Sequence, residues 1–136
     1  MRAYLSGWCY HAITDDWCVT QNIQQMHRDH VPELPANCEL LASTPISPNQ
    51  GFVRYSPSAE SPSPRRPSDI QIFTVQGHPE FTESIVDKIV AFRSSTGVID
   101  KPTAETAKSR AKWRNDGVPV IAPVIWKILG ADTRDS

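Results

Sequence analysis

Short runs of β-branched and aromatic residues, separated by stretches rich in proline and polar residues, dominate the hydrophobic pattern of the first part of the chain. Residues 70–76 (IQIFTVQ) form the clearest run, and they predict a buried strand that ends at Gly77. Residues 39–44 (ELLAST) and 51–55 (GFVRY) predict two further strands, and residues 22–31 (NIQQMHRDHV) predict a short strand that runs into a polar turn.

Helical periodicity replaces this pattern in the last third of the chain. Residues 82–93 predict an amphipathic helix, which Gly97 terminates. Its predicted apolar stripe consists of Ile85, Ile89 and Phe92, with Val86 and Val90 beside them. Residues 103–114 predict a polar surface helix, and a last helix is expected to begin near Pro123, where a first-turn proline is tolerated, and to end at Gly130.

Two stretches carry no regular period. Residues 1–21 crowd aromatic, Cys and His side chains together without a period of 2 or 3.6, so they are assigned to no element. Residues 56–68 (SPSAESPSPRRPS) predict a surface loop, because their prolines suit neither a central strand nor a packed helix. The predicted organisation is one domain over residues 22–130, followed by a short tail at residues 131–136.

Charge and cysteine content narrow the classes of partner and compartment. The 14 Lys and Arg residues nearly balance the 15 Asp and Glu residues, which argues against a nucleic-acid-binding surface of the usual basic kind. No window approaches the roughly 20 apolar residues of a membrane-spanning helix. The three cysteines, Cys9, Cys18 and Cys38, suit neither a disulfide framework nor a Cys-x-x-Cys site, which predicts reduced thiols in a cytoplasmic protein.

The sequence Gly77-His78-Pro79-Glu80, between a predicted strand and a predicted helix, is the candidate for chemistry. Ligands of open α/β sheets bind at such strand ends. In extended backbone His78 and Glu80 would point to the same side. A carboxylate there can hold an imidazole in one tautomer and so prepare a base for a Cys or Ser nucleophile. Because His-x-Glu also occurs by chance, spacing alone leaves a purely structural role open.

In this context residues 74–81 (TVQGHPEF) resemble the signature that closes class I glutamine amidotransferase domains, which is a hydrophobic strand followed by Gln-Gly/Phe-His-Pro-Glu. Upstream, residues 25–31 (QMHRDHV) followed by Leu34-Pro35 are similar to the His-x-Asp segment of that family. Residues 40–44 (LLAST) are similar to the strand that follows it. The similarity covers roughly residues 22–95, and the tail resembles that of fungal-type members.

The resemblance implies a flavodoxin-like α/β fold, present here as a partial sheet with flanking helices. It also implies hydrolysis of the glutamine side-chain amide through a Cys-His-Glu triad, in which His78 would be the base and Glu80 would orient it. The residues that it places around the substrate pocket are Gln76, Gly77, His27 and Asp29. The implied ligand is glutamine or another γ-glutamyl small molecule, with no cofactor or metal ion, and any partner protein is left unspecified.

The nucleophile is where the match to the family ends. The family carries its cysteine in a Gly-x-Cys-x-Gly elbow upstream of His-x-Asp, and the partial match here is Gly7-Trp8-Cys9-Tyr10-His11. His11 replaces the second glycine, and Cys9 precedes His27 by only 18 residues, too few for the helix and strands that separate the two motifs in the family. The sequence therefore predicts a truncated, inactive member, with Cys9 as a weak candidate nucleophile.

Several alternatives stay open beside this hypothesis. The chain could be a non-catalytic remnant or interaction module, or a γ-glutamyl peptidase-type hydrolase. A metal site built from His27, Asp29, His30 and His78 is disfavoured, because adjacent residues face opposite ways on a strand. Loss of the first half of a doubly wound sheet also predicts marginal stability or an exposed sheet edge.

Overall fold

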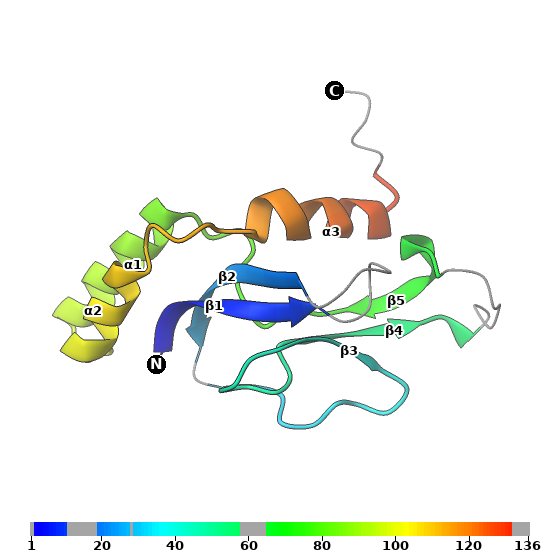
Figure 1. The fold of residues 1–136 in the computed structure, drawn as a ribbon, viewed down its shortest axis with the longest axis horizontal. Helices are drawn as coiled ribbons and strands as arrows, with labels where there is room; N and C mark the ends of the chain where they lie inside the picture. Colours follow the sequence, from blue (N-terminus) through cyan, green and yellow to red (C-terminus); the bar gives the residue numbers. More distant parts are fainter. Residues whose placement is uncertain (1, 11–18, 28, 58–64, 132–136) are drawn as a thin grey trace.

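Five antiparallel strands form one sheet in the part of the chain that the computed structural model describes, which is residues 2–10, 19–27, 29–57 and 65–131, with side chains from residue 22 onward. The strand order is β2-β1-β3-β4-β5 (Figure 1). The strands are β1 (Arg2–Tyr10), β2 (Val19–His27), β3 (Glu39–Ser43), β4 (Gly51–Tyr55) and β5 (Ile70–Phe73). Every neighbouring pair runs antiparallel.

The sheet agrees with the predicted strands but differs from the predicted fold in its pairing. Strands are confirmed in the segments 22–31, 39–44, 51–55 and 70–76, and the mixed α/β class is confirmed with them. The parallel pairing of a flavodoxin-like sheet is absent from the described residues, where the strands form hairpin-like antiparallel ladders. Residues 1–21, which have no periodic pattern, supply β1 and the start of β2.

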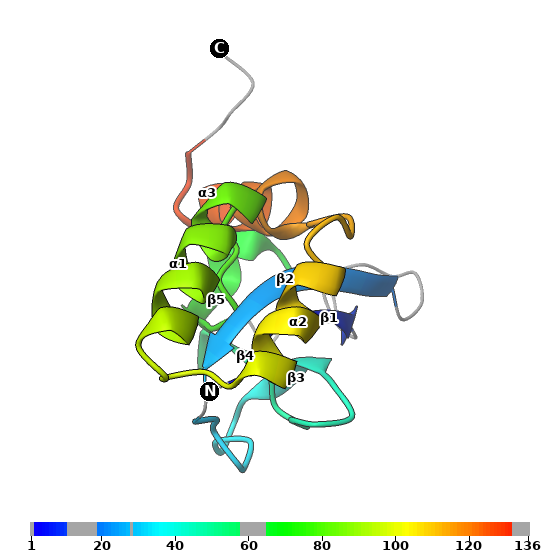
Figure 2. The same ribbon diagram turned by 90° about the vertical axis from the view of Figure 1, so that its left-hand side faces the viewer.

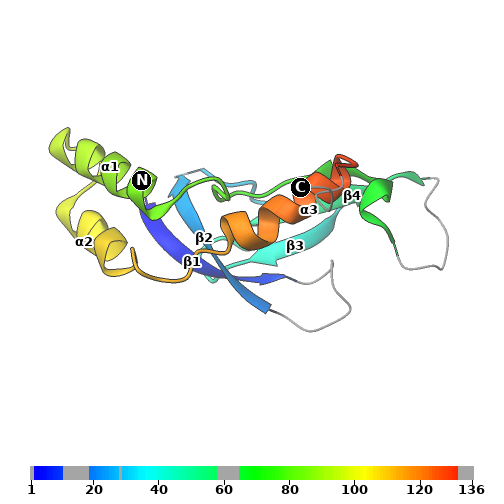
Figure 3. The same ribbon diagram turned by 90° about the horizontal axis from the view of Figure 1, so that it is seen from above.

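Within the described part of the chain, three α-helices follow the sheet, α1 (Glu83–Ser95), α2 (Lys101–Ser109) and α3 (Ala122–Ile128). A π-helical turn at Gly117–Ile121 leads directly into α3. Figure 1 shows α3 along one face of the sheet, and Figures 2 and 3 show α1 and α2 together at the end where β2 finishes. The predicted helix ends are confirmed, because Gly97 and Gly130 have φ of 73° and 71°, which favour glycine.

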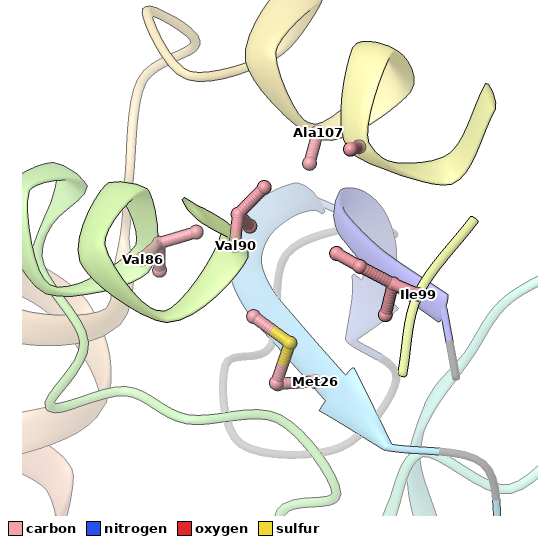
Figure 4. Close-up of a cluster of buried hydrophobic side chains, with 6 residues drawn as sticks. Met26, Val86, Val90, Ile99 and Ala107 are labelled. Atoms are coloured by element: carbon pink, nitrogen blue, oxygen red, sulfur yellow. The ribbon is translucent and has the colours of Figure 1, made fainter. Parts of the chain in front are cut away.

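Two hydrophobic clusters hold the helices to the sheet. In the first, shown in Figure 4, Met26 of β2 meets α1, α2 and the segment between them through Val86, Val90, Ile99, Ala104 and Ala107. The second joins strand residues Ile23, Leu41, Ala42 and Val53 to Ile121. Half-buried side chains extend the second cluster toward β5 and α3, among them Phe73, Val75 and Ile125.

The buried face of α1 is rotated from the predicted one. Val86 and Val90 are 8% and 2% exposed, whereas Ile85 and Phe92, predicted to be buried, are 39% and 68% exposed. Ile89 packs against the first cluster and is partly buried. The pattern alone could not choose between two adjacent apolar stripes, and the position of α2 beside Val86 and Val90 decides which one is covered.

Helix α2 begins two residues earlier than predicted because Asp100 caps it. The Thr103 backbone N–H donates to Asp100 Oδ1 at 2.8 Å, and Pro102 lies in the first turn, where it breaks no helical hydrogen bond. Hydrogen bonding from Thr103 lowers the pKa of Asp100. Residues 58–64 of the Pro/Ser-rich loop predicted at residues 56–68 lie outside the described residues, and a short 3-10 turn at Pro67–Asp69 includes the end of the predicted loop.

Candidate functional site

The His-Pro-Glu element follows β5 and connects two strands that lie at opposite ends of the strand order. The backbone stays paired with β4 just beyond Phe73, since the Thr74 N–H donates to Phe52 O at 3.0 Å. The Gln76 N–H then donates at 2.8 Å to the backbone oxygen of Gln50, the residue before β4. Two residues later the His78 N–H donates to Gln24 O of β2 at 2.9 Å, in an isolated antiparallel bridge. These bonds fix the backbone immediately before and at the candidate base.

Glycine at position 77 is required by a close approach to β2. A Cβ at this position would lie 2.7 Å from Gln25 Nε2, 2.9 Å from Ile23 Cγ2 and 3.0 Å from Gln24 O. Any side chain would therefore push the strand end away from β2. Gly77 fits its predicted place at the strand end for this reason.

His78 and Glu80 form the contact that their spacing predicts. His78 Nδ1 lies 2.9 Å from Glu80 Oε1, and the two side chains are 36% and 63% exposed. Pro79 and Glu80 form a turn rather than the predicted extended backbone, with the Phe81 N–H donating to His78 O at 3.2 Å. The side chains meet across this turn, so the predicted contact is confirmed and the predicted backbone is wrong.

The protonation pattern of the pair follows from the donor and acceptor inventory. An ionised carboxylate can only accept hydrogen bonds, so Nδ1 of His78 is the donor to Glu80. In the neutral ring this leaves Nε2 without a proton and able to accept one. The arrangement can therefore serve as a general base, with the carboxylate holding the ring in the tautomer required.

An aromatic ring completes the immediate surroundings of the imidazole. The rings of His78 and Phe81 stack with centroids 4.1 Å apart and an interplanar angle of 6°. Stacking of this kind restricts rotation of a ring that is otherwise half-exposed. Phe81 is not among the predicted site residues, although its place directly after His-Pro-Glu is a signal that could have suggested it.

His27 and Gln76, two of the predicted pocket residues, both contact a third, Asp29. His27 Nδ1 lies 2.8 Å from the backbone oxygen of Asp29, and Gln76 Nε2 donates to the same oxygen at 3.1 Å. The contact uses the main-chain carbonyl of Asp29, so its carboxylate is not what joins the three residues. Whether these residues bind substrate stays a prediction.

The tautomer of His27 determines how the buried Gln25 amide is oriented. A carbonyl only accepts, so His27 Nδ1 donates to Asp29 O, and in the neutral ring Nε2 is then an acceptor. His27 Nε2 lies 2.6 Å from Gln25 Oε1, while Gln25 Nε2 is buried without a hydrogen-bond partner among the described residues. Exchanging the amide oxygen and nitrogen, by half a turn of the amide, lets the Gln25 amide donate to His27 Nε2.

The cysteines are placed only in part. The backbone of Cys9 lies in β1, paired with Thr20 of β2 and Ser43 of β3, but its side chain and the whole of Cys18 lie outside the described residues. Cys38 is half-buried in a turn, where its N–H donates to Pro35 O at 3.2 Å. The hydrogen bonds of the described residues do not join Cys38 to His78.

Two other classes of site have no support in the described ranges. No group of three or more His, Cys, Asp or Glu residues there is arranged to hold a metal ion. None of the helices within those ranges has the length and apolar character of a membrane span.

Comparison with known proteins finds a similar protein over part of the chain. Over 91 residues, 67% of its length, the chain is 34% identical to a Schizosaccharomyces pombe protein named as glutamine amidotransferase-like. The match spans 31% of that protein, so the chain corresponds to about a third of its length. No family model matches the chain, and no solved structure matches it. The chain is thus similar to a glutamine amidotransferase-like protein over a limited region.

Proposed function

We propose that the chain is the C-terminal part of a class I glutamine amidotransferase-like domain and carries its base and the residue that orients it. The observation that carries the proposal is the hydrogen bond from His78 Nδ1 to Glu80, 2.9 Å long, in the segment that leaves β5 and is bonded at His78 to Gln24 of β2. In the complete domain a flavodoxin-like sheet would continue beyond the strands of this chain and supply the nucleophile elbow.

The proposed reaction gives each residue one role. Nε2 of His78 takes the proton of a cysteine thiol, and the thiolate attacks the side-chain amide carbon of glutamine. The same imidazole then returns the proton to the leaving ammonia, which leaves a γ-glutamyl thioester that water hydrolyses. Glu80 holds the ring and stabilises its protonated form, while His27, Asp29, Gln76 and Gly77 line the pocket for the γ-glutamyl group.

We further propose that the chain by itself does not hydrolyse glutamine. A nucleophile elbow is a sharp turn from a strand into a helix. Cys9 lies instead in β1, whose antiparallel partner β2 is the next described element. Without an activated thiolate the acyl-transfer step has no attacking group.

Ammonia release tests the catalytic half of this proposal. The purified chain, a His78→Ala variant and a Cys9→Ser variant are incubated with glutamine and, separately, with a γ-glutamyl dipeptide. Equal background release from all three is expected with both substrates. Release from the parent chain that both substitutions abolish would overturn the proposed inactivity and identify Cys9 as the nucleophile.

Ligand binding tests the family role independently of turnover. Glutamine added to the isotopically labelled chain is expected to shift the NMR signals of His78 and Gln76, whereas asparagine, one methylene shorter, should leave them in place. A chain whose spectrum does not respond to millimolar glutamine, or responds equally to both amides, would contradict the proposed pocket.

A further inference from the structure

The segment Asn115-Asp116-Gly117 lies against the His-Pro-Glu turn although it is more than thirty residues away in sequence. Asn115 Nδ2 donates to the backbone oxygen of Phe81 at 2.7 Å. Gly117 packs so closely on the turn that a Cβ there would lie 2.3 Å from Pro79 O. The segment is also braced internally, because the Gly117 N–H donates to Asn115 Oδ1 at 3.0 Å.

Asp116 anchors this segment to β2, the strand with which the His78 backbone also pairs. Its N–H donates to Asn22 O at 2.8 Å, and its Oδ2 accepts from the Asn22 N–H at 2.9 Å. The carboxylate thus takes the place of a neighbouring strand's carbonyl. Asp116 is 1% exposed and its carboxylate is paired with Arg114. Because His78 bonds to Gln24, two residues along β2, the turn and the segment share one support.

The geometry points to a positioning role for this segment, and we propose that Asn115, Asp116 and Gly117 set the orientation of the His78 imidazole. Asn115 acts through Phe81, whose backbone oxygen it holds and whose ring lies parallel to the imidazole at 4.1 Å. The stacked ring and the Glu80 carboxylate together fix the plane and the tautomer of His78. The functional meaning of this role rests on the proposed function of His78 as the base.

The variant Asn115→Asp tests the tether with the smallest change of shape. It keeps the oxygen that accepts from the Gly117 N–H and replaces the amide donor by an acceptor that faces Phe81 O. NMR then follows two signals of His78: the shift of its carbon-bound ring protons caused by the Phe81 ring, and the Nδ1–H signal protected by Glu80. Loss of both signals is expected, while urea unfolding stays cooperative.

Thr106→Ala is the matched control, because it removes another hydrogen bond from a side chain to a backbone oxygen, Thr106 Oγ1 to Pro102 O at 2.9 Å within α2. The control should leave both His78 signals unchanged. Unchanged signals in Asn115→Asp would overturn the proposal, and so would equal losses in the control, which would indicate general loosening of the fold.

Phe81→Leu keeps the inference testable if Asn115→Asp does not fold. It retains the backbone oxygen that Asn115 holds but removes the stacked ring, so loss of the ring-proton shift together with weaker protection of Nδ1–H is expected. If the His78 Nδ1–H of this variant is as well protected from exchange with water as in the parent chain, the proposal is overturned. These two NMR signals of His78 do not depend on turnover. If the variants behave as expected but the parent chain does not bind glutamine, the positioning role stands and the proposed function is contradicted.

Discussion

Substituting Gly117 by alanine is expected to displace the His-Pro-Glu turn as well as to destabilise the fold. The added Cβ would lie 2.3 Å from the oxygen, 2.7 Å from the Cα and 2.8 Å from the carbonyl carbon of Pro79. All three are backbone atoms, so no side-chain rotation relieves the overlap. Ordinary contact begins at 3.4 Å, so the Pro79 carbonyl must withdraw by about 1 Å.

Two magnitudes follow from this displacement. Overpacking of a buried site costs about 1–3 kcal/mol, which lowers the urea midpoint by roughly 1 M for a domain of ordinary urea sensitivity. A shift of about 1 Å would also break the 2.9 Å contact between His78 and Glu80, since hydrogen bonds weaken beyond about 3.2 Å. In a complete catalytic domain, misplacement on this scale can cost about a hundredfold in rate.

The assay combines urea unfolding with the NMR signal of the His78 Nδ1–H, and Gly97→Ala serves as the control. Gly97 has φ of 73° and nothing within 4 Å of its Cβ position, so alanine there costs about 1–2 kcal/mol through backbone strain alone. Both variants should lose stability, but only Gly117→Ala should lose the His78 signal. If Gly117→Ala unfolds like the parent and keeps that signal, the close packing on Pro79 is not a feature of the protein in solution.

Three further predictions concern the core, a helix cap and a buried amide. In urea melts Val90→Ala should lower the free energy of unfolding by about 2 kcal/mol, and Phe92→Ala should lower it by under about 0.5 kcal/mol. The reverse order would place the stripe of α1 that contains Ile85 and Phe92 in the core. The lowered pKa of Asp100 adds stability to the folded state that is present above about pH 4 and is lost as pH falls through the pKa of the folded state. In Asp100→Asn the free energy of unfolding should therefore fall less steeply below about pH 4 than in the parent chain. Equal dependence on pH in the two chains would count against the cap. At pH 8 the His27 nitrogens should appear protonated at Nδ1 and bare at Nε2, and a proton on Nε2 would mean that Gln25 presents its oxygen there.

Most elements could be predicted because their signals are local. The strands at 39–44 and 51–55, the helix at 82–93 and the positive φ of Gly97 all follow from periodicity or backbone preference within a few residues. The contact between His78 and Glu80 was likewise within reach of spacing. It formed across a turn, however, because Pro79 and Glu80 do not continue the extended backbone.

The remaining features depend on contacts between distant segments. No local period marks β1, whose partner strands are β2 and β3. Gln24 and Gln25, polar residues in a strand predicted to be short and to run into a polar turn, are 4% and 2% exposed because other segments cover that strand. Asn115 and Asp116 bond to residues 34 and 94 positions away, and nothing in their own neighbourhood marks them as part of a site.

The outer edge of β2 explains why the site and the stability of the fold are coupled. The sequence predicts marginal stability or an exposed sheet edge. On the outer edge of β2 the backbone is paired at Asn22 and Gln24, by Asp116 and His78. Neither partner belongs to a strand. His78 is part of the His-Pro-Glu turn, and Asp116 anchors the segment that packs on this turn. An edge strand left open is prone to pair with other chains. Substitutions that release His78 or Asp116 should therefore expose this edge, so loss of the imidazole geometry and a tendency to associate are expected to appear in the same variants.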